Sequence, residues 1–277
     1  MQEKRQQQGR IYVDAFWVMT ANVAGQDWMG WHERKKISAS IFERIPCHLV
    51  GFQEFGVNTW EVLGPVREDL KLIPGLVAGE LNINAIAYNF DRFEPLSSGT
   101  FWLSDDGTYK KAWDGSERGA SWATLHDKHR DRDLMLVNVH LDNKSPEAQT
   151  KGTELVLKFI AQQEPHLPVI ITADSNVSVD SRHVRWQDPK MRQPYELMKK
   201  AGFEDVWVET HKGDPKRPFT YHGFQGEDYS LDEWGTYDTE WIMTRGLKPL
   251  NCVLIRDSIG GIWPSDHYWM MALVNYT

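Results

Sequence analysis

Seven polar side chains that could do acid–base or metal chemistry follow short apolar runs along the 277-residue chain: Asn22, Glu54, His140, Asp174, Asn176, Asp266 and His267. Carboxylate and amide oxygens are the ligands that Mg²⁺ or Mn²⁺ prefers, whereas zinc calls for closely spaced nitrogen or sulfur ligands, which the sequence does not show. Two histidines together with a hard cation indicate phosphoester chemistry. Singly, each residue is explained as well by a turn, a helix cap or a satisfied histidine.

The elements that must position these residues alternate along the chain. Apolar runs predict strands at 11–21, 48–53, 76–89, 134–139, 168–173, 240–244, 252–255 and 268–275. Helical spacing predicts helices behind residue 31, over 60–70, around 155–160 and over 191–201. The fold class is therefore mixed α/β. Polar residues just past strand ends are typical of an α/β active site, because the sheet holds them while the loops admit a ligand.

Composition limits the partners. Lys and Arg number 31 against 39 Asp and Glu, a formal charge of −8, which disfavours wrapping of long duplex nucleic acid. The densest charged run, at 126–133, has mixed sign and predicts a solvated hairpin turn. A small phosphoester, a nucleotide or a short single-stranded nucleic acid fits this balance better.

The sequence also gives expectations for compartment and organisation. Cys47 and Cys252 are the two cysteines, so a disulfide framework is excluded. The chain shows neither the apolar stretch of a signal peptide nor that of a membrane span, so we expect a cytoplasmic protein without a membrane partner. No linker or repeat divides it and no obligate protein partner is evident, which predicts a single domain over residues 11–277 after a polar tail at 1–10.

Five short motifs occur in order: MTAN at 19–22, GFQE at 51–54, VNVHLD at 137–142, TADSN at 172–176 and SDH at 265–267. In this order they resemble the endonuclease/exonuclease/phosphatase superfamily, over about residues 11–275. Connecting segments, among them WHER at 31–34 and TYHGF at 220–224, are similar to its bacterial branch nearest the deadenylases, and the superfamily includes pancreatic deoxyribonuclease. The resemblance implies a four-layered α/β sandwich, in which two packed mixed β-sheets are flanked by helices.

The resemblance also implies roles. Glu54 binds the Mg²⁺ or Mn²⁺ ion, with Asn22 and Asp266 close by, and Asp174 orients or deprotonates the attacking water. Asn176 holds that water or a phosphate oxygen, while His140 and His267 donate hydrogen bonds to the phosphate. The reaction is then in-line hydrolysis at phosphorus. Arg118 and His222 are candidates for substrate contact, although a surface charge and a turn histidine explain them nearly as well.

Three positions depart from the superfamily pattern. Glu240 stands where an Asp normally partners the last histidine, and Asp238 competes for that role from the same strand face. Asn82 stands where the pattern has a Glu, and a register shift would let Glu80 serve instead. Gln149 occupies a helix-start position that commonly holds Arg, so reduced phosphate affinity and a neutral surface change both remain open.

The chain has 13 Trp, more than its 11 Phe or 9 Tyr. Those inside strand patterns are expected in the core. Five lie in loop-like stretches and are candidates for stacking on a base or a sugar ring: Trp28, Trp113, Trp186, Trp234 and Trp263. Trp263 is the first choice for a substrate contact because it lies two residues before Ser265.

These observations favour a divalent-metal-dependent phosphodiesterase or phosphatase, with nuclease-like action on short strands or nucleotides as one form. An alternative is a sugar-phosphate or lipid-headgroup phosphatase, although no amphipathic membrane helix favours lipid. A second alternative is a catalytically weak binding module of the same fold, suggested by Asn82, Glu240 and Gln149.

Overall fold

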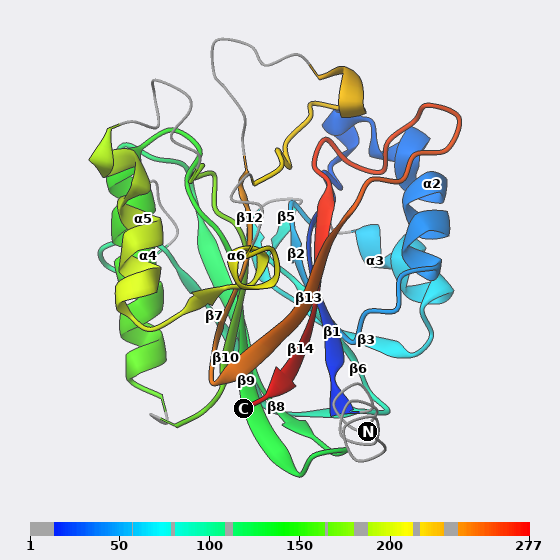
Figure 1. Cartoon of the computed structure of the whole chain (residues 1–277). Helices are drawn as coiled ribbons and strands as arrows, with labels where there is room; N and C mark the ends of the chain where they lie inside the picture. Colours follow the sequence, from blue (N-terminus) through cyan, green and yellow to red (C-terminus); the bar gives the residue numbers. More distant parts are fainter. Residues whose placement is uncertain are drawn as a thin grey trace.

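Two β-sheets packed face to face form the centre of the protein, and helices cover the outer face of each (Figure 1). The structure is a computed structural model that describes residues 14–56, 58–78, 81–108, 113–163, 166–179, 188–212, 217–229 and 238–277. The predicted tail at 1–10 and the first residues of the strand predicted at 11–21 lie outside the described residues. None of the helices in the described part of the chain has the length and apolar character that a bilayer span requires.

The first sheet has six strands in the order β13-β14-β1-β2-β6-β3. β1 (Phe16–Asn22) lies parallel to β2 (Leu49–Gln53) and antiparallel to β14 (Trp269–Tyr276). The outer positions belong to β13 (Leu247–Ile255), β6 (Ile86–Asn89) and β3 (Leu70–Ile73). Helices α2 (Trp31–Glu43) and α3 (Thr59–Leu63) cover it, with the short 3₁₀ turns η1 (Asp27–Met29) and η2 (Gly64–Val66) beside them.

The second sheet also has six strands, in the order β11-β12-β10-β9-β8-β7. β10 (Val169–Asp174) lies parallel to β9 (Arg132–His140) and antiparallel to β12 (Glu240–Arg245). β11 (Glu204–Asp205), β8 (Gly119–Asp127) and β7 (Phe93–Trp102) complete it. Helices α4 (Pro146–Ala161) and α5 (Pro189–Lys200) cover its outer face (Figure 1).

The remaining described elements are short. β4 (Leu76–Ala78) and β5 (Leu81–Ile83) form a two-stranded ribbon, α6 (Val206–Thr210) follows β11, and η4 (Gly226–Asp228) lies between α6 and β12 in the chain.

Three apolar clusters separate the four layers, and the alternation of side chains along each strand produces them. In β1, Val18 belongs to the cluster between the sheets, whereas its neighbour Met19 belongs to the cluster under α2 and α3. In β10, Ile170 faces the other sheet and Ile171 faces α4 and α5. The predicted four-layered sandwich with two mixed sheets is therefore confirmed.

A polar network joins the two sheets directly beneath the edge where the motifs end. Asn138 of β9 accepts from Gln53 of β2 at 2.7 Å and donates to the carbonyl of Phe52 at 2.7 Å, and Thr172 of β10 donates to Asn138 at 3.1 Å. A Cβ at Gly51 would collide with Thr172 and Asn138, so glycine is what lets the sheets approach here. The network holds the two sheets together at this edge.

One helix differs from the sequence prediction. The helix expected over 60–70 ends early: Pro65 lies in η2, and Leu70 already begins strand β3. Pro lacks the N–H that a continuing helix needs, which explains why the chain leaves the helix there. Helix α4 does form as its sequence predicts, with Ser145 accepting from Ala148 N at 3.2 Å and Pro146 in the first turn.

Candidate active site

Three of the predicted site residues lie side by side on adjacent strands. Asp174 ends β10 and is paired in register with His140 at the end of β9 and with Glu240 at the start of β12. Residues in register across neighbouring strands point to the same face. The second sheet therefore presents an imidazole and two carboxylates in one row.

The first sheet supplies the facing residues. Asn22 ends β1, Glu54 follows β2, and Asp266 and His267 precede β14. Glu54 adopts a left-handed backbone with φ of 51°, and Asn176 has the same value. Non-glycine residues rarely adopt this conformation, and such outliers cluster at functional sites.

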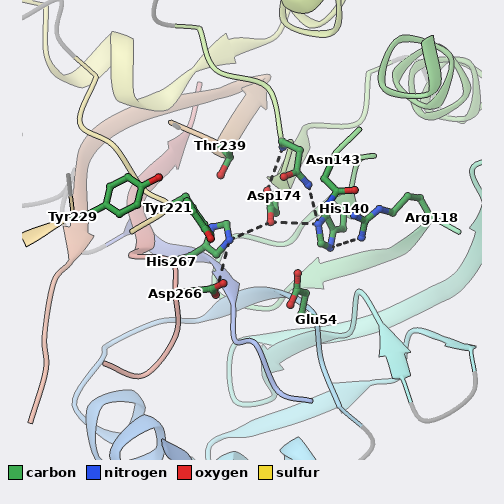
Figure 2. A pocket seen from close by; sticks show the side chains of 11 residues that line it. Glu54, Arg118, His140, Asn143, Asp174, Tyr221, Tyr229, Thr239, Asp266 and His267 are labelled. Atoms are coloured by element: carbon green, nitrogen blue, oxygen red, sulfur yellow. Dashed lines mark hydrogen bonds and ion pairs between the residues drawn. The ribbon is translucent and has the colours of Figure 1, made fainter. Parts of the chain in front are cut away.

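A cavity of about 360 Å³ opens where these two edges meet (Figure 2). Its wall contains seven of the residues that the sequence predicts, Arg118 among them, and four others; the full lining is Glu54, Arg118, His140, Asn143, Asp174, Asn176, Tyr221, Tyr229, Thr239, Asp266 and His267. The volume is at the lower end of the range for small-molecule sites.

Asp174 lies at the centre of the site. Its Oδ2 accepts from Asn22 Nδ2 at 2.9 Å and lies 3.3 Å from His140 Nε2 and 3.8 Å from His267 Nε2. Burial raises the pKa of this carboxyl, but the neighbouring histidines and the Asn22 hydrogen bond outweigh burial and lower it. Asp174 is therefore an ionised carboxylate, available as a hydrogen-bond acceptor for water.

His267 is oriented by Glu240. Glu240 Oε1 lies 2.5 Å from His267 Nδ1, so Nδ1 donates to the carboxylate and Nε2 faces the cavity. Burial lowers the pKa of His267, but the carboxylates of Glu240 and Asp174 override it and hold this pKa well above its usual value. Asp238, the competing partner, instead pairs with Arg217 Nε at 2.6 Å. Of the two carboxylates, it is Glu240 that touches the histidine.

His140 is neutral, with a hydrogen-bond donor beside each ring nitrogen. Burial, and then the charge of Arg118, lowers the pKa of His140 to about 3. The Arg118 guanidinium lies 3.2 Å from Nδ1, and the Asn176 amide nitrogen lies 3.0 Å from Nε2. Both groups can only donate, and a neutral imidazole has one acceptor nitrogen, so only one of the two contacts is a hydrogen bond at a time. The same Asn176 nitrogen donates to the carbonyl of Leu141 at 3.1 Å.

The donor set fits a hard divalent cation. Burial, and then the nearby charges of Asp266 and Asp174, raises the pKa of Glu54, so three carboxylates compete for one small volume. Glu54, His140 and Asp174 each offer a ligand atom, and these atoms lie within 4.8 Å of one another. Oxygen donors dominate this cluster, which suits Mg²⁺ or Mn²⁺. Asn22 lies beside it, with Oδ1 accepting from Ala24 N at 3.0 Å.

Two predicted substrate residues lie elsewhere. His222 and Trp263 do not line the cavity: their rings pack together at 5.0 Å, and His222 accepts from Gly226 N at 3.0 Å. Trp263 instead borders a separate hollow of about 300 Å³ beside Arg34. Successive side chains of an extended segment point in opposite directions, so His222 is buried whereas its neighbour Tyr221 lines the cavity.

Sequence reasoning missed four residues of the wall: Asn143, Tyr221, Tyr229 and Thr239. Tyr221 carries a usable signal, since it adjoins the predicted His222 within a recognised motif. Asn143 likewise follows the motif at 137–142 directly and Thr239 precedes Glu240, whereas Tyr229 lies in a loop with no such pattern.

Gln149 is a buried part of the site's frame. It is 2% exposed, and its Nε2 donates to the carbonyls of Asp142 at 2.7 Å and Asn176 at 3.0 Å. The interpretation as a neutral surface change is therefore wrong. Glu80 lies outside the described residues, and for Asn82 the structure describes only its backbone pairing with Val77, so their exchange of roles stays a prediction.

Solved structures of similar shape identify the fold. This chain superposes on an endonuclease/exonuclease/phosphatase from Bacteroides vulgatus with a TM-score of 0.77 and 22% identity, over 95% of this chain and 99% of that chain. A Bacteroides thetaiotaomicron mannosyl-6-phosphatase matches with a TM-score of 0.75 and 20% identity over 94% and 100% of the two chains. This chain has the endonuclease/exonuclease/phosphatase fold. TDP2 from D. rerio, complexed with a single-strand DNA product, has the same fold, with a TM-score of 0.75 and 19% identity over 94% and 99%.

No family model and no curated protein matches the sequence of this chain, so the solved structures are what identify its fold. The endonuclease/exonuclease/phosphatase fold that the five motifs predict is confirmed. Six motif residues meet where the edges of the two sheets form the cavity: Glu54, His140, Asp174, Asn176, Asp266 and His267.

Proposed function

We propose that this protein is a divalent-metal-dependent hydrolase of phosphate esters. The observation that carries the proposal is the position of Asp174: its carboxylate lies between two histidines at the floor of a cavity that also presents Glu54 and Asp266. A buried base flanked by proton donors and a hard-oxygen cluster is the equipment that in-line attack of water on phosphorus requires.

The metal residues are Glu54 and Asp266, with Asn22 supporting them. With Mg²⁺ or Mn²⁺ held there, the site would supply positive charge against the phosphate oxygens. The cluster of carboxylates that raises the pKa of Glu54 is the feature of this chain that favours such an ion.

The remaining residues act on water and phosphate. Asp174 accepts a hydrogen bond from the attacking water and takes its proton. His267 donates from Nε2 to a phosphate oxygen, because Glu240 occupies Nδ1. When Arg118 donates to Nδ1, His140 carries its proton on Nε2 and donates from there on the opposite side. Asn176 and Arg118 add further donors where negative charge grows in the transition state.

A sugar-phosphate phosphatase is the second candidate within this class. The small cavity favours it, and one neighbour of the same fold is named a mannosyl-6-phosphatase. Another neighbour is complexed with single-strand DNA, so a short strand or nucleotide also belongs in the substrate panel.

Hydrolysis of p-nitrophenyl phosphate and its bis ester tests the proposal. We expect turnover with Mg²⁺ or Mn²⁺, none with EDTA, and loss of at least about 100-fold in His267→Asn. His32→Asn is the matched control, because this exposed histidine lies outside the cavity. A well-folded protein that turns over neither ester would favour the catalytically weak binding module.

A further inference from the structure

An aromatic corner forms one end of the active-site cavity. Tyr221 and Tyr229 both line the cavity, with their ring centroids 5.8 Å apart and their planes at 87°. Both side chains are half-buried. Two rings at a right angle offer one face and one edge to a third ring placed against them.

The corner lies at a defined position relative to the reacting groups. A chain of contacts runs from Tyr221 to His267 at 5.0 Å between ring centroids, from His267 to Asp174 at 3.8 Å, and on through His140 to Arg118. Figure 2 shows the tyrosines at one side of the site and Arg118 at the other, with Asp174 between them. A phosphate at Asp174 therefore has an aromatic wall on one side and a guanidinium on the other.

The two ends suit different chemical groups. Arg118 has no carboxylate within ion-pair distance among the described residues, and its Nε is buried without a hydrogen-bond partner there. That end suits anionic oxygens. The tyrosine end suits the flat or apolar face of a ring, because an aromatic surface stacks on nucleobases and packs against apolar faces.

The corner is held in place by the same segments that hold the catalytic residues. Tyr221 pairs with His267 through a backbone bridge, and Thr220 accepts from the backbone N–H of Thr239 at 2.8 Å. Phe219 packs against the Tyr229 ring at 6.0 Å. A preformed surface of this kind binds a ring at low entropic cost.

We propose that Tyr221 and Tyr229 form the subsite for the alcohol part of the substrate, and that this alcohol carries a ring. The substrate class is a small phosphate ester of a sugar or of a nucleoside, with the ring against the tyrosines and the phosphate over Asp174. The inference rests on the proposed function. A cavity of about 360 Å³ with one arginine along its described wall accommodates one such ester better than a chain of phosphates.

The experiment compares ring-bearing with ring-free substrates. Glycerol 3-phosphate, a hexose 6-phosphate, a nucleoside 5′-monophosphate and a short single-stranded oligonucleotide are each assayed with Mn²⁺. The readout is the ratio of kcat/KM for the ring-bearing ester to that for glycerol 3-phosphate. We expect Tyr229→Ala to lower this ratio roughly ten-fold, mostly through KM, and Tyr229→Phe to retain it, because stacking needs the ring and not the hydroxyl. Whether the hexose or the nucleoside ester has the larger ratio decides between the two sources of the ring.

Trp28→Ala is the control, since Trp28 is 81% exposed and does not line the cavity; it should leave the ratio unchanged. An unchanged ratio in both Tyr221→Ala and Tyr229→Ala, with wild-type turnover intact, would overturn the subsite while leaving the hydrolase standing. A preference for the oligonucleotide that neither tyrosine variant alters would also overturn it. Absence of turnover for every ester would instead remove the proposed function, and the inference with it.

Discussion

Glu240 Oε1 lies 2.5 Å from Nδ1 of His267, and Glu240 is also in register with Asp174 on the neighbouring strand. The Glu240 carboxylate thereby fixes which ring nitrogen of His267 is directed at the cavity. Where the superfamily pattern suggests an Asp, this chain reaches the same nitrogen with the longer Glu side chain.

Glu240→Gln should lower kcat by about 100-fold or more, because a neutral amide no longer stabilises the protonated form of His267 or fixes the orientation of its ring as the carboxylate does. Asp238→Asn is the contrasting variant. Asp238 pairs with the buried Arg217, and Asp238→Asn leaves that guanidinium without this counter-charge, so the variant should have a lower unfolding temperature while the folded fraction retains its kcat. Steady-state kinetics with melting curves separate the two outcomes. Equal loss of kcat in both variants would contradict the assignment.

Gln149 should act through Asn176. Gln149→Ala removes two hydrogen bonds to loop carbonyls, so we expect about 1–3 kcal/mol less unfolding free energy and a kcat reduced by about ten-fold. Gln149→Glu should be worse, because a carboxylate would face those same two carbonyl oxygens. Thr153→Ala is the control: Thr153 donates to the Gln149 carbonyl at 2.8 Å within α4, so it should cost stability and leave kcat unchanged. Wild-type stability and turnover in Gln149→Glu would refute this role.

Glu54 should destabilise the metal-free protein. Its raised pKa means that folding disfavours the charged form, so stability falls as pH rises above its unfolded pKa of about 4.3. At pH 7, Glu54→Gln without metal should therefore be more stable than the wild type and have a higher Tm. The increase in Tm that Mn²⁺ produces in the wild type should be lost in the same variant. A variant that Mn²⁺ still stabilises fully would show that Glu54 is not a ligand.

His48 predicts acid sensitivity far from the site. Burial, and then the charges of Arg92 and Arg67, lowers its pKa to about 4, and Nδ1 accepts from Trp17 N at 3.1 Å. In the unfolded state His48 has a pKa near 6.5 and binds a proton at pH values at which the folded state leaves it neutral. The stability of the folded state therefore falls as pH drops from about 6.5 to 4.

His48→Asn keeps an acceptor for Trp17 but cannot titrate. Urea unfolding at several pH values measures how many protons the protein takes up as it unfolds. This variant should take up fewer protons than the wild type, by as many as one. Identical pH slopes for the two proteins would contradict the shifted pKa.

The sandwich and the catalytic edge were predictable because alternation and strand-end residues are local signals. The motif ending in Asp174 follows an unbroken apolar strand, and the alternation of Val18 and Met19 already indicates two apolar faces. Parallel pairing of β9 with β10 then places His140 and Asp174 together without further information.

The end of the cavity formed by Tyr221 and Tyr229 was less predictable because its residues come from loops. Trp263 lies near the catalytic motif in sequence but packs on His222 away from the cavity, whereas Tyr229 reaches the cavity from a segment without a repeating pattern. Among the other loop tryptophans, Trp186 and Trp234 lie outside the described residues. Whether Glu240 or Asp238 contacts His267 depended on the position of Arg217, which pairs with Asp238. The spacing of residues in the sequence does not give that position.

Hydrolysis in ¹⁸O-labelled water tests the central claim most directly. In the proposed mechanism, water activated by Asp174 attacks phosphorus, so with Mn²⁺ the wild type should place one ¹⁸O atom in the released phosphate and none in the alcohol. Asp174→Asn should reduce this labelled product by at least about 100-fold. Label in the alcohol, or a wild-type rate in Asp174→Asn, would contradict the account.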